Sequence, residues 1–352
     1  MWFQILASCW LVASAQASVL FATSKAWNQV VKATMKTHAT YADTEPALSE
    51  WELQQRFENV WDGLLHLCPT LPEDGKRYID VGFDDALLNE ANPPLSRVLG
   101  WASRTELLSK GVWSGALATR EGVTQATGMG LTTLGTLRVA RQPPGGWFRG
   151  GEAVCRYRFR LEDVLLHELL HLLGVSSSVR ELEDGSLAVG AEYMGTCFPG
   201  AFDRKIADKD GNMVVGSRCE FSGSLSQPLF VNGARLYAET DSGDFVQGTS
   251  LSHLMSTNAI LAPSVSDCDP AGTRSLTSED AMALMALNVQ CDAAALPHAT
   301  ILDSPQTTGG SLSTEQTPHP GFFEPSQAYC QVQSCLALTT AVALAVSLAL
   351  HS

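Results

Sequence analysis

Two histidines and a glutamate stand within five residues of one another in the segment HELLHLLG, residues 167–174. In an α-helix, residues four apart lie on the same face, so His167 and His171 can bind one metal ion together. Glu168 can then reach an open fourth position on that metal, where a water or a substrate binds. The segment therefore predicts a helix that carries two metal ligands and a general base for hydrolysis.

The same pattern can also arise by chance in a helix without a metal, because histidine often packs inside a core with its hydrogen bonds satisfied. Apolar residues flank the motif on every side from Val164 to Leu173, which predicts a buried helix. A buried carboxylate is costly unless it is paired or lies near a metal, so Glu168 favours the metal site. Gly174 can end the helix in a left-handed turn.

Composition predicts a folded protein without a nucleic-acid partner. The 352 residues are 45% hydrophobic and 17% charged, enough apolar sequence for one large core or two small ones. The formal net charge of −14 argues against nucleic-acid binding, because phosphate recognition needs a basic surface. Residues 18–295 are expected to form one catalytic body, and residues 296–325, rich in Pro, Ser and Thr, a flexible stalk.

Both ends of the chain predict export to the cell surface. Residues 1–17 are apolar and end in Ala-Gln-Ala, which predicts a cleaved secretory signal peptide, with an N-terminal membrane anchor as the alternative. Residues 326–352 contain small residues, a polar spacer and the uncharged run 336–350, which predict a glycosylphosphatidylinositol anchor. A single-pass helix is the alternative there. In either case the protein is expected at the extracellular face of the plasma membrane.

The number of cysteines fits an extracellular fold. Of nine cysteines, one lies in the predicted signal peptide and two in the anchor segment, which leaves six. An even set in a secreted chain predicts three disulfides, with fifteen possible pairings. The six are Cys68, Cys155, Cys197, Cys219, Cys268 and Cys291.

Apolar spacing predicts a mixed α and β structure around the motif. It predicts a helix over 48–67 with Ser49 as its N-cap, and a second helix over 276–287 with a Thr or Ser cap. Alternation predicts a strand over 77–83. The stretch 114–139 combines β-compatible runs with Gly and Thr turns and is expected to be rich in strands.

Four segments occur in an order that resembles leishmanolysin-like proteases of the metzincin clan: HELLHLLG, then SLSHL at 250–254, ILAPS at 260–264 and LTSEDAMALMALN at 276–288. The resemblance covers roughly residues 167–288. It implies a zincin-like α+β catalytic domain with a twisted sheet, an HExxH active-site helix and a disulfide-tied irregular C-terminal subdomain. It also implies an endopeptidase for protein or peptide substrates, with one zinc ion bound by His167, His171 and His253 and with Glu168 as the general base.

Glu192 is a second candidate for the third zinc ligand, because it follows His171 by 21 residues. Gly190 and Gly195 flank it, and glycine is unfavourable inside the helix that would have to present this carboxylate. His253 is therefore the favoured ligand, since imidazole binds zinc well.

The resemblance has two departures. Ser177 stands six residues after His171, where the commoner metzincins have their third ligand, which excludes a short-motif metzincin, and the second departure lies at the turn that follows the third histidine. Leu261 stands where the family has methionine before Ala-Pro, and Met255 is displaced to two residues after His253. Leucine and methionine fill similar volumes, so the turn can form with Leu261. The departure also allows an alternative function, a catalytically inactive surface protein that acts in binding or adhesion on the same scaffold.

Overall fold

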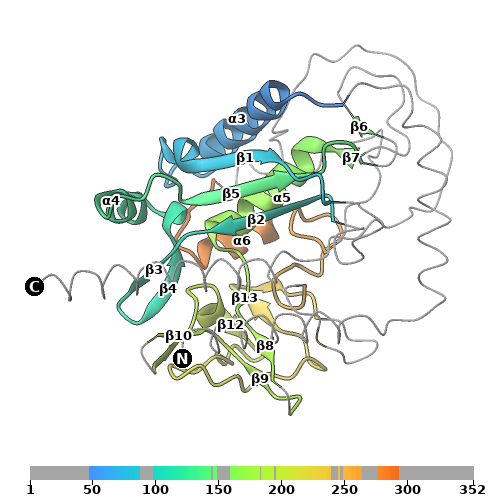
Figure 1. Cartoon of the computed structure of the whole chain (residues 1–352). Coiled ribbons are helices and arrows are strands. Elements are labelled where there is room, and N and C mark those ends of the chain that lie inside the picture. The colour runs from blue at the N-terminus through green and yellow to red at the C-terminus, as the bar shows by residue number, and fades with distance from the viewer. Residues whose placement is uncertain are drawn as a thin grey trace, which may run out of the picture. The chain divides into compact units, whose positions relative to one another are not determined.

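The computed structural model describes residues 47–87, 98–143, 146–148, 159–182, 184–193, 196–238, 245, 249–263 and 276–292. The predicted signal peptide, stalk and anchor segment, together with Cys155 and Cys268, lie outside these ranges. The described part has an α+β fold with four α-helices and several small sheets (Figure 1). None of these helices is both long and apolar enough to cross a membrane.

A three-stranded sheet forms the frame of the fold. Its order is β1 (Ile79–Phe83), β5 (Gly135–Val139) and β2 (Gly100–Arg104). Strand β1 runs parallel to β5, and β2 runs antiparallel to it. Buried positions alternate along β5, as expected for a strand with one face on the core. A Cβ atom at Gly135 would lie 2.7 Å from Leu172, so glycine allows a helix to approach the sheet closely here.

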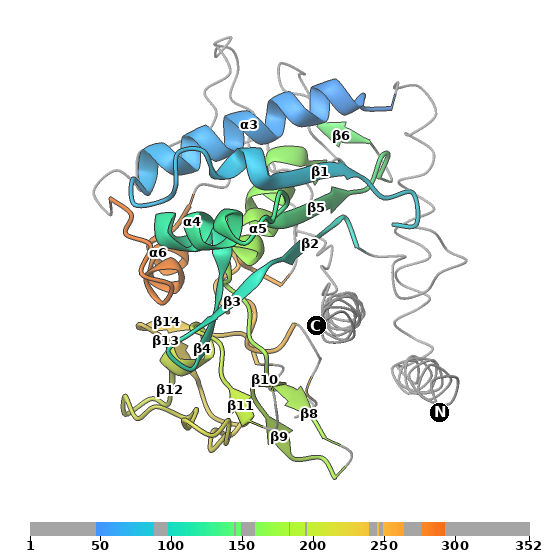
Figure 2. The same cartoon turned by 60° about the vertical axis from the view of Figure 1, so that its left-hand side comes forward.

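Helices α3 (Glu50–Leu67) and α5 (Leu161–Leu173) contact each other and pack on this sheet, α3 against β1 and α5 against β5 and β2 (Figure 2). Ser49 accepts a hydrogen bond from the backbone N–H of Glu52, which confirms the predicted N-cap. The apolar face of α3, including Phe57, is buried as its spacing predicted.

The stretch 114–139 was expected to be rich in strands, but it contains helix α4 (Arg120–Gly128) between β4 (Val112–Gly115) and β5. Thr119 caps this helix by accepting a hydrogen bond from the N–H of Gly122. Only two of its residues are buried, and its Thr and Gly content is unfavourable for a helix in isolation. The weak apolar periodicity explains why the sequence did not predict it.

Helix α6 (Ser278–Met285) lies within the predicted C-terminal helix and has Thr277 as its N-cap. Several short strands lie in the chain between α5 and α6. They are β8 (Arg180–Glu181), β9 (Leu187–Ala188), β10 (Ala191–Tyr193), β11 (Thr196–Phe198), β12 (Ile206–Ala207), β13 (Phe230–Val231) and β14 (Ala234–Arg235). The remaining strands are β3 (Glu106–Ser109), which pairs with β4, and β6 (Trp147–Phe148), which pairs with β7 (Phe159–Arg160).

Two cysteine pairs lie at disulfide distance and account for four of the six predicted half-cystines. Cys68 at the end of α3 is joined to Cys291 after α6, across 223 residues of sequence. Cys197 in β11 is joined to Cys219, which ties together the region of short strands. Closing so long a loop removes much of the entropy of the unfolded chain, so the first pair is expected to stabilise the fold most.

Candidate metal centre

Helix α5 is buried along nearly its whole length because leucine and valine occupy every side of it. Glu162 and Asp163 lie in its first turn, where negative charge interacts favourably with the helix dipole. The helix ends at Gly174, which has a φ of 120° and donates its N–H to the carbonyl of His171. The prediction that Gly174 ends the helix in a left-handed turn is therefore confirmed.

The structure brings His253 to the two histidines of α5. The Nε2 atom of His171 lies 3.0 Å from Nε2 of His167 and 3.3 Å from Nε2 of His253, which is 82 residues further along the chain. One ligand atom from each of the three side chains lies within 4.8 Å of the other two. His167 and His253 are each only 1% exposed, so this histidine group is enclosed by protein.

Each histidine of the group is oriented by a backbone carbonyl. A carbonyl oxygen only accepts hydrogen bonds, so each Nδ1 carries the hydrogen and each Nε2 keeps its lone pair. The Nδ1 donors and their carbonyl acceptors are His167 and Ile260 (2.7 Å), His171 and Val175 (2.6 Å), and His253 and Thr249 (3.1 Å). The lone pairs of the three Nε2 atoms therefore face one another.

This donor set fits a divalent metal ion. Burial lowers the pKa of His171 to about 4 and that of His253 to about 3, so both imidazoles are neutral at physiological pH, as metal ligands must be. Two nitrogens that bind one zinc ion at about 2.0–2.1 Å in tetrahedral geometry lie about 3.3 Å apart, close to the observed spacing. The buried three-histidine group could thus hold a metal ion.

Glu168 lies directly beside this group in the sequence and is 3% exposed. Burial raises its pKa to about 8. Its side chain packs under strand β2, where a Cβ atom at Gly100 would lie 3.1 Å from Cγ of Glu168. A nearby cation would favour the ionised form of this carboxyl group, because opposite charge offsets the cost of burial.

The turn after His253 is held by a buried aspartate that the sequence analysis did not identify. Asp280 in α6 accepts hydrogen bonds at 3.0 Å from the backbone N–H groups of Ile260 and Leu261. It also accepts from the backbone and hydroxyl of Thr277, with which it forms a capping box. Asp280 therefore holds Ile260 in place, and the carbonyl of Ile260 orients His167.

Leu261 occupies the interior of this turn. Its side chain is fully buried, whereas Met255 is 41% exposed. Met255 therefore does not occupy the interior of the turn, and Leu261 fills that position. The tight turn forms without methionine.

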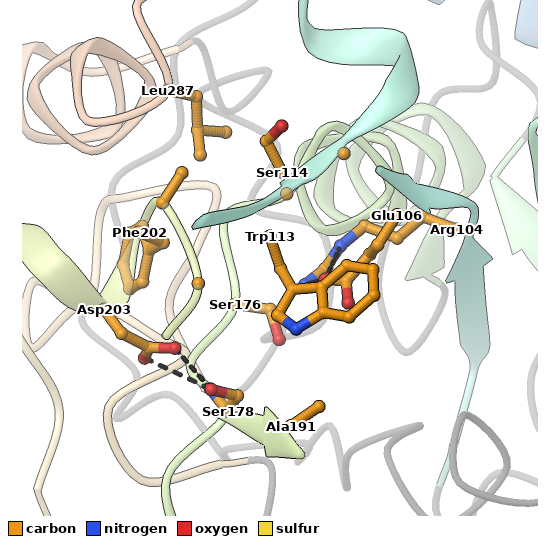
Figure 3. Close-up of a pocket in the computed structure, with 14 residues that line it drawn as sticks. Arg104, Glu106, Trp113, Ser114, Ser176, Ser178, Ala191, Phe202, Asp203 and Leu287 are labelled. Atoms are coloured by element: carbon orange, nitrogen blue, oxygen red, sulfur yellow. Dashed lines mark hydrogen bonds and ion pairs between the residues drawn. The ribbon is translucent and has the colours of Figure 1, made fainter. Parts of the chain in front are cut away.

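A second buried aspartate, Asp203, fixes the loop that follows α5. It accepts hydrogen bonds from the hydroxyl of Ser177 (2.7 Å) and from the backbone and hydroxyl of Ser178, as Figure 3 shows for Ser178. The N–H of Ser177 in turn donates to the hydroxyl of Ser252, next to His253. Asp203 thus helps to hold together the two loops that contact the histidine group.

A small cavity of about 30 Å³ lies beside this loop, lined in part by Asp203, Ser178, Arg104 and Glu106 (Figure 3). Arg104 forms an ion pair with Glu106 (2.6 Å) and donates to the carbonyl of His171 (3.2 Å). The positive charge of Arg104 stabilises the C-terminal end of α5, because the helix dipole is negative there. Arg104 therefore supports the helix that carries two of the three histidines.

Glu192 lies in strand β10, where its backbone pairs with Cys197 of β11. The expectation that no helix forms here is confirmed, and the side chain of Glu192 lies outside the described part.

Comparison of the chain with models of protein families, with curated proteins and with solved structures finds no match.

The role of Asp280 can be tested on stability and on metal affinity. Asp280→Ala is expected to lower the free energy of unfolding by about 3 kcal/mol, because it leaves buried N–H groups without acceptors. It is also expected to weaken metal binding about 10- to 100-fold, as for other groups that orient ligands. Chemical denaturation and chelator competition measure the two effects. Glu279→Ala removes the neighbouring carboxylate as a control, and equal losses in both variants would contradict this role.

Proposed function

We propose that this protein is a zinc-dependent endopeptidase with a zincin-like catalytic domain, similar to the leishmanolysin-like proteases of the metzincin clan. Three buried imidazoles with facing lone pairs support this function most directly, with a carboxylate on the adjacent residue. The order of the motifs adds to this support, because helix, third histidine, turn and closing helix follow one another as in that family. His167, His171 and His253 would hold the zinc ion.

Glu168 is the proposed general base. Bound zinc supplies Lewis-acid chemistry and lowers the pKa of water to about 7. The Glu168 carboxylate takes a proton from the attacking water and gives it to the departing amine of the cleaved peptide bond. The surrounding apolar side chains of α5 exclude bulk water, which strengthens the electrostatic interactions of this carboxylate.

We also propose that the enzyme acts at the extracellular face of the plasma membrane. The signal-like and anchor-like segments at 1–17 and 326–352 support this location, as do the two cysteine pairs at disulfide distance. Its substrates would then be extracellular proteins or peptides.

A catalytically inactive binding or adhesion protein is the second candidate, and Leu261 in place of methionine is the observation that favours it. However, Leu261 is fully buried and its N–H is bonded to Asp280, so the turn is formed. A protein that served only as a scaffold would also gain nothing from the buried carboxylate of Glu168. The enzyme is therefore the better supported function.

Zinc content and peptide cleavage, measured on the same purified protein, test this function. The expected results are one zinc ion per chain, cleavage of a mixed peptide library, loss of cleavage after treatment with a chelator, and recovery on addition of zinc. Elemental analysis measures the metal and mass spectrometry the products. Cleavage that survives complete zinc removal would contradict the mechanism, and stoichiometric zinc without cleavage would favour the binding protein.

A further inference from the structure

A groove distinct from the histidine group lies in the region of short strands. It has a volume of about 530 Å³, and its lining includes Lys110, Arg204 and Arg218. Lys110 lies at the tip of the β3–β4 hairpin, Arg204 in the 3-10 helix Asp203–Lys205, and Arg218 in the turn before Cys219. Three cations from three separate segments thus line one groove.

Among the residues that the structure describes, no ion pair balances the positive charge of this groove. None of the ion pairs between described residues involves Lys110, Arg204 or Arg218, and no acidic side chain of the described part lines the groove. By contrast, Arg104 and Arg138 in the main sheet each pair with an acid. A cationic groove stands out in a chain with 37 acidic and 23 basic residues. Clefts lined by charge of one sign focus the field and attract ligands of the opposite sign.

The carboxylate nearest to Arg218 in the sequence is already engaged. Glu220 accepts a hydrogen bond from the backbone N–H of Arg218 (3.1 Å) and does not line the groove. Its oxygen thus fixes the turn that carries Arg218. The Arg218 guanidinium makes no ion pair with it.

The segments that carry the three cations are tied to one another. The β3–β4 hairpin is bonded to the chain after β11, with Trp113 donating to the carbonyl of Pro199 (3.1 Å) and accepting from the N–H of Ala201 (2.7 Å). The Cys197–Cys219 pair ties β11 to the turn that carries Arg218. These links hold like charges together against their repulsion, so the groove is formed before any ligand binds.

We propose that this groove binds an acidic stretch of a partner polypeptide. Guanidinium groups match carboxylates in shape and can bind them through two hydrogen bonds. Phe198 and Pro199 add an apolar wall, so the groove suits a chain with both acidic and apolar side chains. The volume of about 530 Å³ is that of a site for a compact ligand and can hold a few peptide residues. This proposal does not depend on zinc or on hydrolysis.

A labelled peptide of alternating glutamate and leucine, titrated with the full chain and followed by fluorescence anisotropy, tests this proposal. Binding is expected at low ionic strength, with weaker binding as salt is added. Arg218→Glu and Lys110→Glu are each expected to raise the dissociation constant about tenfold or more. Arg218→Gln, which removes the charge and is closer to the native size, is expected to give a smaller increase.

Lys205→Glu is the matched control, because Lys205 adjoins Arg204, is exposed and does not line the groove. It is expected to change the dissociation constant less than about twofold. Thermal melting of each variant verifies that it is folded. An equal loss in Lys205→Glu, or no binding of the acidic peptide, would overturn the proposal. Equal binding of a control peptide with glutamine in place of each glutamate, or binding of a heparin oligosaccharide in place of the peptide, would also overturn it.

Discussion

Glu168→Gln is expected to abolish peptide cleavage while the protein keeps its zinc ion. The amide cannot accept the proton of the attacking water, and general-base catalysis typically contributes about 10²- to 10⁴-fold to the rate. The three histidines are unchanged, so the metal content should stay at one ion per chain. In the metal-free protein, burial raises the pKa of Glu168 to about 8, so a neutral amide of the same shape should not destabilise the fold.

The measurements are kcat/KM for a peptide substrate, zinc content and thermal melting. Glu162→Gln is the matched control on the same helix, where Glu162 pairs with Arg56 and does not adjoin the histidine group. It is expected to leave kcat/KM nearly unchanged. Normal cleavage by Glu168→Gln would show that another group takes the proton, and loss of zinc together with activity would show that Glu168 supports the metal site itself.

Local sequence signals predicted the elements of the site that lie within one segment. Ser49, Gly174 and Thr277 mark helix ends through hydrogen bonds that span only a few residues, so a short window of sequence contains the whole signal. The pairing of His167 with His171 follows in the same way from the four-residue repeat of the helix. His253 lies 82 residues after His171, and only the resemblance of the motif order to a known protease family predicted its role.

The buried aspartates could not be predicted in this way. Asp280 contacts backbone N–H groups 19 and 20 residues away, and Asp203 contacts serines 25 and 26 residues away. Backbone donors are present at every residue except proline, so no residue pattern marks these partners. Thr277 followed three residues later by Asp280 is a partial signal, because this spacing fits a capping box. The hydrogen bonds of Asp280 to Ile260 and Leu261, however, depend on the tertiary structure.

The cationic groove was missed for a related reason. Lys110, Arg204 and Arg218 lie far apart from one another in the sequence, and a net charge of −14 predicts an acidic surface. The Cys197–Cys219 link and the pairing of Trp113 with the chain at 199–201 bring them together. Net charge describes the average surface, whereas binding depends on the local field.

The identity of the third ligand is the prediction on which the metzincin assignment depends most. His253→Ala is expected to weaken zinc binding by more than about 100-fold, because each of three ligands supplies a share of a binding free energy of order 10 kcal/mol. Glu192→Ala is expected to leave zinc affinity unchanged, since its backbone lies in strand β10 and not on the helix that a carboxylate ligand would require. Competition with a chromophoric chelator measures both affinities.

His66→Ala controls for the loss of a histidine elsewhere, because His66 lies near the end of α3 and is not part of the three-histidine group. This variant should bind zinc as the unchanged protein does. His253→Ala keeps both cysteine pairs of the described part, and its melting temperature in the absence of zinc measures whether it is folded. If zinc were lost in Glu192→Ala and retained in His253→Ala, the third ligand would be the carboxylate, and the metzincin-like arrangement would be contradicted. If zinc is lost in His253→Ala and retained in Glu192→Ala, the third ligand is the imidazole whose lone pair faces those of His167 and His171.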